Sequence, residues 1–542
     1  MLTRANIGEV MPGVVTPLTL STFLHALRLG ESKDQEVRPS EMLTIIDGRA
    51  YIDVRGLWNS FSGIVGVSPG TVLSKGIGCD LKGQESELAA IRRDIDFGRV
   101  IKTAYVWLEI LTMSWVKPRL VRNLRGYLQQ NLNQIEAKSI ENLHKREMWS
   151  DLQTLLDLTS HSFQWHMQSS FIALCAYALL RDNLACIAGE SISDQLISIS
   201  NPSLDNMAAF RSSIAILAAE AKASPEISKI FFDTPEKTLL QALSGSSEGK
   251  YFLKKLIRIG RILGDRASQE FELYMPRWSE DPRSLLIALR AFVVGETEQM
   301  DTVSASTDYD CQPKLKDLAR RVPWPRRWLV QRLNRTFVAY SELREQTKSG
   351  LMRCFGEARR RYLNLGTRLN SEGYLAQPED IFFLTLEEIQ ALFIDAKGTN
   401  DYSQVARERK VTYEKQKLLD FTSKAGALDE NTVILRGTAV SGGRVTGRAR
   451  LVSDPASSSL QQGDILVTEY TDPGWMPLFL IAGAIVTEIG GTLSHTAILA
   501  RESRKPAVFS VLGATGLIRE GQLITVDGNI GEIHLHSEGS IL

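Results

Sequence analysis

One histidine, His495, lies in a stretch whose residue types and spacing could carry out phosphoryl transfer. A short apolar run, typical of a buried strand, ends before Gly490 and Gly491. After the histidine, a helical pattern runs from about Thr496 to Arg504, and Pro506 stops it. We therefore expect His495 on a strand-to-helix turn, in the first turn of the helix.

The surroundings of His495 suit a phosphorylated intermediate for physical reasons. Glycine lets the backbone approach a bulky anion and adopts positive φ readily. The free N–H groups and the dipole of a helix N-terminus favour negative charge, and the hydroxyl groups of Thr492, Ser494 and Thr496 add donors. An imidazole, which titrates at about 6.5 when unperturbed, is a usable nucleophile near neutral pH. The alternative is a histidine that only caps the helix or occupies the surface.

The pattern of this stretch resembles the phosphohistidine signature of the phosphoenolpyruvate (PEP)-utilising enzymes, a family that includes PEP synthase, pyruvate phosphate dikinase and rifampin phosphotransferase. The matching residues are Gly490, Gly491, Ser494, His495, Ala497, Ile498, Ala500, Arg501, Glu502 and Pro506-Ala507-Val508. The resemblance implies that His495 is the catalytic residue that carries the phosphoryl group. It also implies a phosphate-binding role for the residues around it, namely Gly490, Gly491, Thr492, Ser494 and Arg501.

Composition narrows the classes of function. At 542 residues the chain is long enough for roughly two to four domains. Lys and Arg together number 63, as do Asp and Glu, so no charge excess points to nucleic acid or to an acidic membrane. The N-terminus has no signal-peptide pattern, and the longest apolar run, Phe171–Leu180, is too short to cross a bilayer. The five cysteines lack the spacing of a metal site, so we expect reduced thiols in a cytoplasmic protein.

Two kinds of periodicity divide the chain. Residues 1–424 are predicted to be mainly helical, with helical periods dominating from about 85 to 295. Residues 425–433 are predicted as a linker. Residues 434–542 contain short strands, glycine turns and one main helix that starts at His495, which predicts a compact mixed α/β domain. The expected fold class is α+β multidomain, and the C-terminal part resembles the swivelling β/β/α phosphohistidine domain of the same family.

A second candidate site lies within the helical region. The segment 264–282 resembles the rifampin phosphotransferase branch, in which His-Arg-Gly commonly stands where this chain has Asp265-Arg266-Ala267. Without that histidine, Asp265 is the candidate base for an acceptor hydroxyl, and Glu270 is the second choice. Arg266 could hold a phosphate or carboxylate in a bidentate manner. The alternative is a buried structural Asp–Arg or Glu–Arg pair. The resemblance makes the helical region the part that binds the acceptor.

Other segments carry weaker expectations. Thr16, Pro17 and Thr19 resemble the opening of the acceptor-binding region of that branch and are candidates for lining a site. The polar, proline-bent loop 471–478 also matches the branch and is predicted to form the rim around His495. A plain connection between strands is the alternative for this loop.

Two further segments resemble architectural parts of the family. A long helix is predicted from about 324 to 370, and the charges of Ser341–Lys348 within it are predicted to lie on a solvated face. Residues 378–389 predict a short strand followed by a helix, in which Thr385 and Glu388 have capping-box spacing.

Two departures from the family lie near the histidine motif. Relatives usually carry Gly-Ile where this chain has Arg504-Lys505, and often glycine where it has Ser510. Both lie outside the nucleophile motif. We expect them to tune docking of the domain and to leave the chemistry intact.

The resemblance also implies how His495 is charged. In the family, the phosphoryl group comes from ATP bound by an ATP-grasp domain or from PEP bound by a barrel domain. The chain starts with the acceptor region and ends after the histidine domain, so we expect a separate ATP-grasp subunit, as in phenylphosphate synthase. That partner would bind ATP and Mg²⁺, form AMP and phosphate, and pass the β-phosphoryl group to His495. We expect no cofactor or metal on this chain itself, and neither nucleic acid nor membrane as a partner.

The expected function is therefore that of a phosphotransferase subunit. The C-terminal domain would pivot on the linker and deliver the phosphoryl group to a small organic acceptor, most simply at a hydroxyl. The alternative is a non-catalytic binding or regulatory remnant of the same family. The joint presence of Gly490, Gly491, His495 and Arg501 argues against a remnant.

Overall fold

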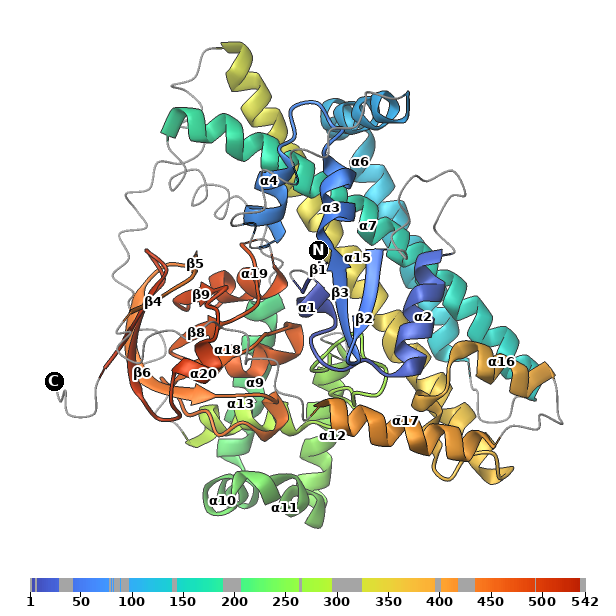
Figure 1. Cartoon of the computed structure of the whole chain (residues 1–542). Helices are drawn as coiled ribbons and strands as arrows, with labels where there is room; N and C mark the ends of the chain where they lie inside the picture. Colours follow the sequence, from blue (N-terminus) through green and yellow to red (C-terminus); the bar gives the residue numbers. More distant parts are fainter. Residues whose placement is uncertain are drawn as a thin grey trace.

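The computed structural model contains a largely helical N-terminal region and a C-terminal domain built on a mixed sheet (Figure 1). The predicted α+β multidomain fold class is confirmed. The predicted linker, 425–433, lies outside the described residues. Those residues are 2–4, 7–28, 42–77, 79, 81, 88, 97–138, 144–188, 206–262, 266–294, 324–394, 401–417, 434–492 and 494–536.

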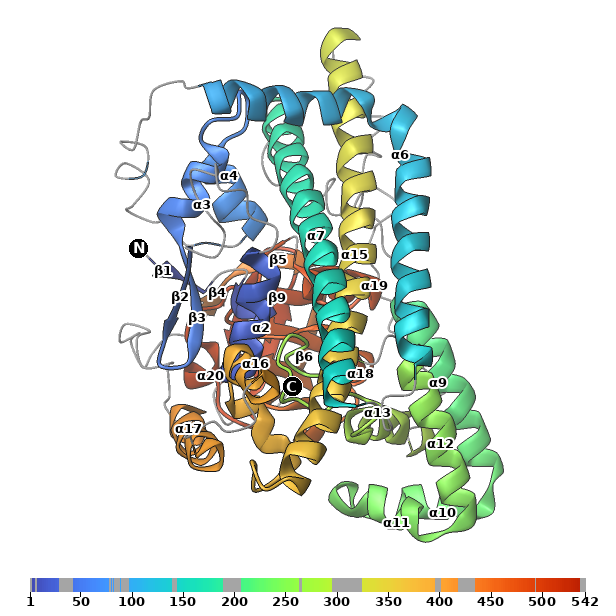
Figure 2. The ribbon, with the colours of Figure 1, turned by 90° about the vertical axis from the view of Figure 1, so that its right-hand side faces the viewer.

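Long helices form the frame of the helical region. They are α6 (Phe97–Ala137), α7 (Lys145–Ala188) and α15 (Trp324–Ser371). Figure 2 shows α7 and α15 running side by side, with the later part of α6 alongside α15 and its first part across their upper ends. α7 and α15 share one apolar cluster near Phe163 and Phe355 and a second near Tyr177 and Phe337. The long helix predicted from 324 to 370 is confirmed.

Shorter elements surround this frame. The helices are α1 (Ile7–Val10), α2 (Pro17–Arg28), α3 (Val54–Phe61), α4 (Pro69–Thr71), the π-helix η2 (Val72–Ile77), α16 (Leu386–Ile394) and α17 (Tyr402–Lys417). A small antiparallel sheet has the order β1 (Leu2–Thr3), β3 (Arg49–Asp53), β2 (Leu43–Ile46). Across the described ranges, the structure contains no helix long and apolar enough to span a membrane.

The prediction of a short strand after Pro378 is wrong. The structure has a 3₁₀ helix there, η6 (Pro378–Phe383), because proline stands at its first position and the Asp380 carboxylate caps its first turn. The capping box that follows is confirmed. The Thr385 N–H donates to Glu388 Oε2 at 2.8 Å, and the Glu388 N–H donates to Thr385 Oγ1 at 3.3 Å.

The C-terminal domain is organised by an 8-stranded sheet of order β4-β11-β10-β6-β7-β8-β9-β5. β6 to β9 are parallel, and the other pairs are antiparallel. The strands are β4 (Ile434–Arg436), β5 (Thr438–Ser441), β6 (Arg444–Leu451), β7 (Ile465–Thr468), β8 (Ala484–Thr487), β9 (Ala507–Phe509), β10 (Leu523–Asp527) and β11 (Glu532–Leu535).

β7, β8 and β9 lie at the centre of this domain because most of their residues are apolar on both faces. Every residue of β7, β8 and β9 is buried. The domain also contains η8 (Pro455–Ser457), η9 (Pro473–Trp475), α18 (Met476–Ile481), α19 (His495–Glu502) and α20 (Ala514–Leu517).

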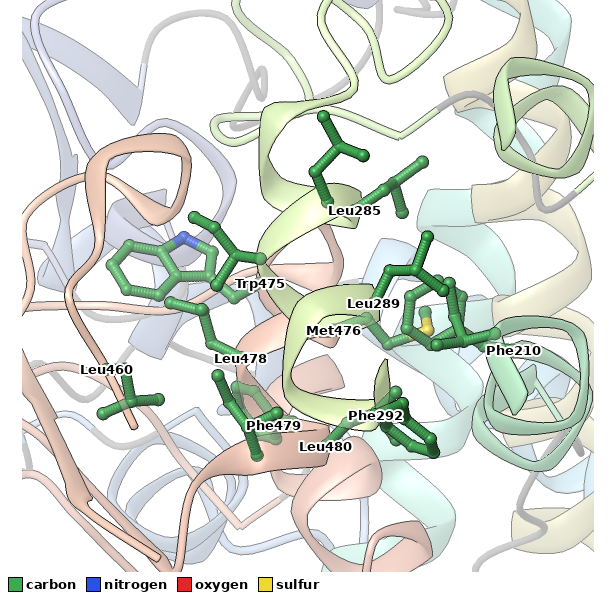
Figure 3. Packing of buried hydrophobic residues seen from close by; sticks show 14 of the residues in the cluster. Phe210, Leu285, Leu289, Phe292, Leu460, Trp475, Met476, Leu478, Phe479 and Leu480 are labelled. Carbon is green, nitrogen blue, oxygen red and sulfur yellow. The ribbon is translucent and has the colours of Figure 1, made fainter. Parts of the chain in front are cut away.

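A second group of helices joins the two parts of the molecule. These helices are α9 (Asn206–Ala223), α10 (Pro225–Asp233), η3 (Glu236–Thr238), α11 (Leu239–Gly245), α12 (Ser247–Ile262) and α13 (Arg283–Val294). Their buried side chains form one continuous cluster with those of the C-terminal domain. Figure 3 shows Leu285 and Leu289 of α13 between Phe210 of α9 and Trp475 and Phe479 of the C-terminal domain. The two parts therefore share a hydrophobic core, which we call the shared core.

The shared core predicts that one substitution destabilises both parts. Phe479→Ala should lower the free energy of unfolding by about 3–5 kcal/mol, because Phe479 is fully buried in this core. Denaturant unfolding followed by circular dichroism measures the change. Leu512→Ala is the control, since Leu512 is 65% exposed and its loss should change the free energy by no more than about 0.5 kcal/mol. Equal effects of the two substitutions would contradict the shared core.

Candidate functional site

The histidine loop, residues 488–494, lies at the carboxyl edge of the parallel strands. It follows β8, and the loop 469–475 follows the neighbouring strand β7. The Glu488 N–H donates to Thr468 O at 3.2 Å, and the Ile489 N–H donates to Glu469 O at 2.9 Å. The two loops therefore lie next to each other, at the edge where parallel α/β sheets commonly bind ligands. Residues 473–475 form η9 and residues 476–478 begin α18, so the segment 471–478 is partly helical, and its role as the rim around His495 stays a prediction.

His495 is the first residue of α19, as its spacing predicted. Ser494 is the N-cap, and its Oγ accepts a hydrogen bond from the Ala497 N–H at 3.0 Å. Thr496 Oγ1 lies 3.1 Å from Ser494 Oγ. The structure describes the backbone of His495 but not its imidazole. The first turn of α19 is therefore capped, and the positive end of the helix dipole lies at the position of the candidate nucleophile.

Gly490 occupies a position that only glycine fits. Its φ is +149°, and an added Cβ would lie 2.9 Å from Phe509 Cδ2. The next loop along the sheet also holds it, because Ser510 Oγ donates to Gly490 O at 2.6 Å. Ser510 has a φ of 56°, a conformation that favours glycine. Serine therefore adds a bond to the histidine loop at the cost of backbone strain.

Arg501 stabilises the same loop from the other end of α19. Its guanidinium donates to Thr492 O at 3.0 Å and to Val440 O at 3.3 Å. Gly491 O accepts a hydrogen bond from the Ser494 N–H at 3.0 Å. Phosphate binding by Gly490, Gly491, Thr492, Ser494 and Arg501 stays a prediction.

Segment 266–278 of the helical region contains the second candidate site. Arg266 Nη1 lies 2.7 Å from Glu270 Oε1, and Lys348 Nζ of α15 lies 3.3 Å from Glu270 Oε2. The side chains of all three are at most 9% exposed. This arrangement is the buried Glu–Arg pair that the sequence left as an alternative, with a lysine added. Asp265 lies outside the described residues, so its role as a base stays a prediction.

The prediction that the charged side chains of residues 341–348 lie on a solvated face is wrong. Ser341, Arg344, Thr347 and Lys348 are all buried. The helical charge pattern looked like a surface, but Glu270 of segment 266–278 pairs with Lys348 on this face. Sequence reasoning therefore missed Lys348, and only the four-residue spacing from Arg344 to Lys348 placed the two on one face.

Asp472 connects the C-terminal domain to segment 266–278. Its Oδ2 accepts a hydrogen bond from the Gln269 N–H at 2.5 Å, and its Oδ1 accepts one from the Gly474 N–H at 2.8 Å. Burial, followed by the negative charge of Glu270, raises the pKa of Asp472 to about 7, although Lys348 opposes this effect. No sequence pattern singled out this residue beyond its place in the loop.

The N-terminal segment lies against both candidate sites. Thr16 Oγ1 and Thr19 Oγ1 each donate to Glu272 Oε1 at 2.7 Å, and burial raises the pKa of Glu272. These threonines thus anchor segment 266–278. On the other side, a Cβ placed on Gly8 would lie 3.3 Å from Ile489 Cδ1, so α1 packs against the histidine loop. Within the described residues, no group of three or more His, Cys, Asp and Glu side chains could hold a metal ion.

Comparisons with known proteins agree with this arrangement. Residues 460–531 match the mobile domain of PEP-utilising enzymes, and residues 166–345 match the fourth domain of rifampicin phosphotransferase. The predicted resemblance to this family, in its rifampicin phosphotransferase branch, is confirmed.

Curated relatives give the same result. Rifampicin phosphotransferase of Streptomyces sviceus is 34% identical over 296 residues, which cover 51% of this chain and 33% of that protein. The Bacillus cereus enzyme is 30% identical over 293 residues, which cover 50% and 33%. A prodigiosin synthesizing transferase of Serratia marcescens is 29% identical over 290 residues, which cover 50% and 32%. The chain thus spans about a third of the length of the curated relatives it matches.

The C-terminus of α19 generates a stability prediction. Arg504 has a φ of 53°, its N–H donates to Arg501 O at 3.1 Å, and the Lys505 N–H donates to Ala500 O at 3.1 Å. This is a Schellman cap with arginine at the position that glycine prefers. Arg504→Gly should therefore raise the free energy of unfolding by up to about 1 kcal/mol, as measured by denaturant unfolding.

Arg504→Ala is the matched control. It removes the same side chain but retains the backbone strain, so it should not stabilise the protein. Equal stabilisation by alanine and glycine would mean that the arginine side chain, and not its φ, is the source of the effect.

Proposed function

We propose that this chain transfers a phosphoryl group from a phosphohistidine at His495 to a small organic acceptor held by the helical region. The observation that carries the proposal is the position of the signature. His495 begins α19 at the carboxyl edge of the parallel strands, and this edge faces the helical region.

Charging of His495 is the first half of the cycle. An ATP-grasp subunit would bind ATP with Mg²⁺. An imidazole nitrogen would take the β-phosphoryl group, and water would take the γ-phosphoryl group, so the products are phosphohistidine, AMP and inorganic phosphate. The capped first turn of α19 would favour the negative charge that His495 then carries.

Transfer to the acceptor is the second half. The acceptor hydroxyl oxygen would attack phosphorus as the N–P bond breaks, and the hydroxyl proton would go to a carboxylate. Glu270 and Asp265 are the candidate bases. Arg266 and Lys348 would balance the charge of the transferring group, because both lie beside Glu270 in a buried site.

The class of acceptor follows from the relatives. Rifampicin phosphotransferases and a prodigiosin synthesizing transferase each match about half of the chain. Both names refer to organic molecules. We therefore propose an organic acceptor, with a hydroxyl as the simplest attacking group. The alternative, a binding or regulatory remnant of the family, would retain the fold without phosphorylation of His495.

Phosphorylation of His495 tests the proposal. The tagged chain is incubated with β-³²P-ATP in lysate of the native host and then recovered. Wild type should acquire an acid-labile, alkali-stable label that His495→Ala lacks. His144→Ala is the matched control, because His144 is exposed and lies outside the site. It should be labelled like wild type.

Other outcomes would change the account. The absence of label from folded wild type would favour the remnant or a donor other than ATP. Equal label on wild type and His495→Ala would place the phosphate on another residue.

A further inference from the structure

Two polar side-chain atoms of the loop 469–475 are buried without a hydrogen-bond partner in the part of the chain that the structure describes. They are Thr471 Oγ1 and Trp475 Nε1, in residues that are 1% and 0% exposed. Most buried polar groups in folded proteins are paired, and a group that is not paired lowers the stability of the protein. The two atoms therefore need a partner that the described residues do not supply.

A third atom of this kind lies in segment 266–278. Arg266 is 8% exposed, and its Nη1 pairs with Glu270, but its Nε has no hydrogen-bond partner among the described groups. Arg266 also lies close enough to Asp472 for the two charges to interact. The third atom thus belongs to a residue beside the loop that holds the other two.

The loop and the segment touch directly at Gly474. A Cβ added to Gly474 would lie 2.1 Å from Ala267 O. In the chain, Ala267 follows Arg266, and Gly474 precedes Trp475. The unpaired atoms therefore belong to residues at or next to one contact between the two parts of the molecule. We call these three atoms the donor site: Thr471 Oγ1, Trp475 Nε1 and Arg266 Nε.

The chemistry of the donor site identifies the class of its partner. The N–H groups of an indole and of a guanidinium only donate hydrogen bonds, and a hydroxyl group can donate as well. The missing partner must therefore offer acceptor oxygens. The carboxylate of Asp472 already accepts hydrogen bonds at both oxygens, from the Gln269 N–H and the Gly474 N–H. An oxyanion from outside the described residues fits three such donors.

The donor site lies beside the helix of the candidate nucleophile. The 3₁₀ helix η9, which ends at Trp475, contacts α19, which begins at His495. The loop that contains η9 also runs next to the histidine loop, because the Ile489 N–H donates to Glu469 O. An oxyanion attached to His495 is therefore the ligand that the position of the donor site favours.

We propose that the donor site binds the phosphoryl group that His495 carries while the C-terminal domain lies against segment 266–278. This inference rests on the proposed function and adds Thr471 and Trp475 to it as phosphoryl-binding residues. Before phosphorylation the three donors are buried and unpaired. The phosphoryl oxygens would accept their hydrogen bonds, so phosphorylation of His495 supplies the partner that the resting chain lacks.

Melting temperatures of the unphosphorylated chain test whether the Thr471 hydroxyl is unpaired. Thr471→Val removes this hydroxyl with little change of shape, and it should raise the melting temperature. Thr468→Val is the matched control, because Thr468 is equally buried but its Oγ1 donates to Tyr470 O at 3.1 Å. The control should lower the melting temperature. Equal decreases for the two variants would mean that Thr471 has a partner, such as an ordered water, and would overturn the proposal.

The indole signal of Trp475 tests the ligand. Potassium phosphoramidate passes its phosphoryl group to histidine and releases ammonia, so no partner subunit is needed, and mass spectrometry shows whether His495 is modified. In the chain labelled with ¹⁵N-tryptophan, Trp475→Phe identifies the signal. Its indole proton should move downfield on phosphorylation, because the N–H gains an acceptor. The signal of Trp328, which is 52% exposed, is the control and should not move.

Variants separate this inference from the proposed function. His495→Ala should abolish the downfield shift. Thr471→Val should reduce the shift, and Thr471→Ser, which restores a hydroxyl, should recover it. An unmoved Trp475 signal in chain that is phosphorylated at His495 would overturn the donor site and leave the proposed function standing. Failure of His495 to accept a phosphoryl group would contradict both.

Discussion

The rest of the structure depends on the ion pairs and hydrogen bonds that the buried carboxylates of segment 266–278 make. Glu270 pairs with Lys348 of the long helix α15, and Glu272 accepts hydrogen bonds from Thr16 and Thr19 of the N-terminal segment. A buried carboxylate is costly unless charges and donors compensate it, so its partners must stay in place. Through the Gln269 N–H the same segment also binds Asp472, in the loop that follows β7. Three parts of the chain that are far apart in sequence thus meet on one short segment.

The shared core holds the C-terminal domain on the helical region through apolar burial, at roughly 25 cal/mol per Å². Polar contacts lie beside this core, because Asp472 accepts hydrogen bonds from the Gln269 N–H and the Gly474 N–H. Release of the domain, which the proposed cycle requires, would have to break both kinds of contact.

Local signals in the sequence predicted the parts of the site that local chemistry determines. The turn at Gly490, the helix that starts at His495 and the capping box of Thr385 all depend on neighbours within a few residues. The strand predicted after Pro378 failed because a proline and a capping carboxylate favour a 3₁₀ turn over an extended chain. Burial of Lys348 could not be predicted, because its partner Glu270 lies far away in the sequence and no local pattern shows that the two meet. The contact between Asp472 and Gln269 could not be predicted for the same reason, because a hydrogen bond between distant loops leaves no periodic pattern in the sequence.

The central claim is that His495 carries a phosphoryl group to an acceptor held near segment 266–278. The most direct test starts from chain labelled at His495 and freed of donor and nucleotide, to which a small-molecule extract of the host is added. We expect the label to pass to one organic compound. Lys348→Met, which removes the charge but keeps an apolar side chain of similar length, should slow this step while charging is unchanged. Release of the label from wild type only as inorganic phosphate, at the same rate with and without extract, would contradict the account.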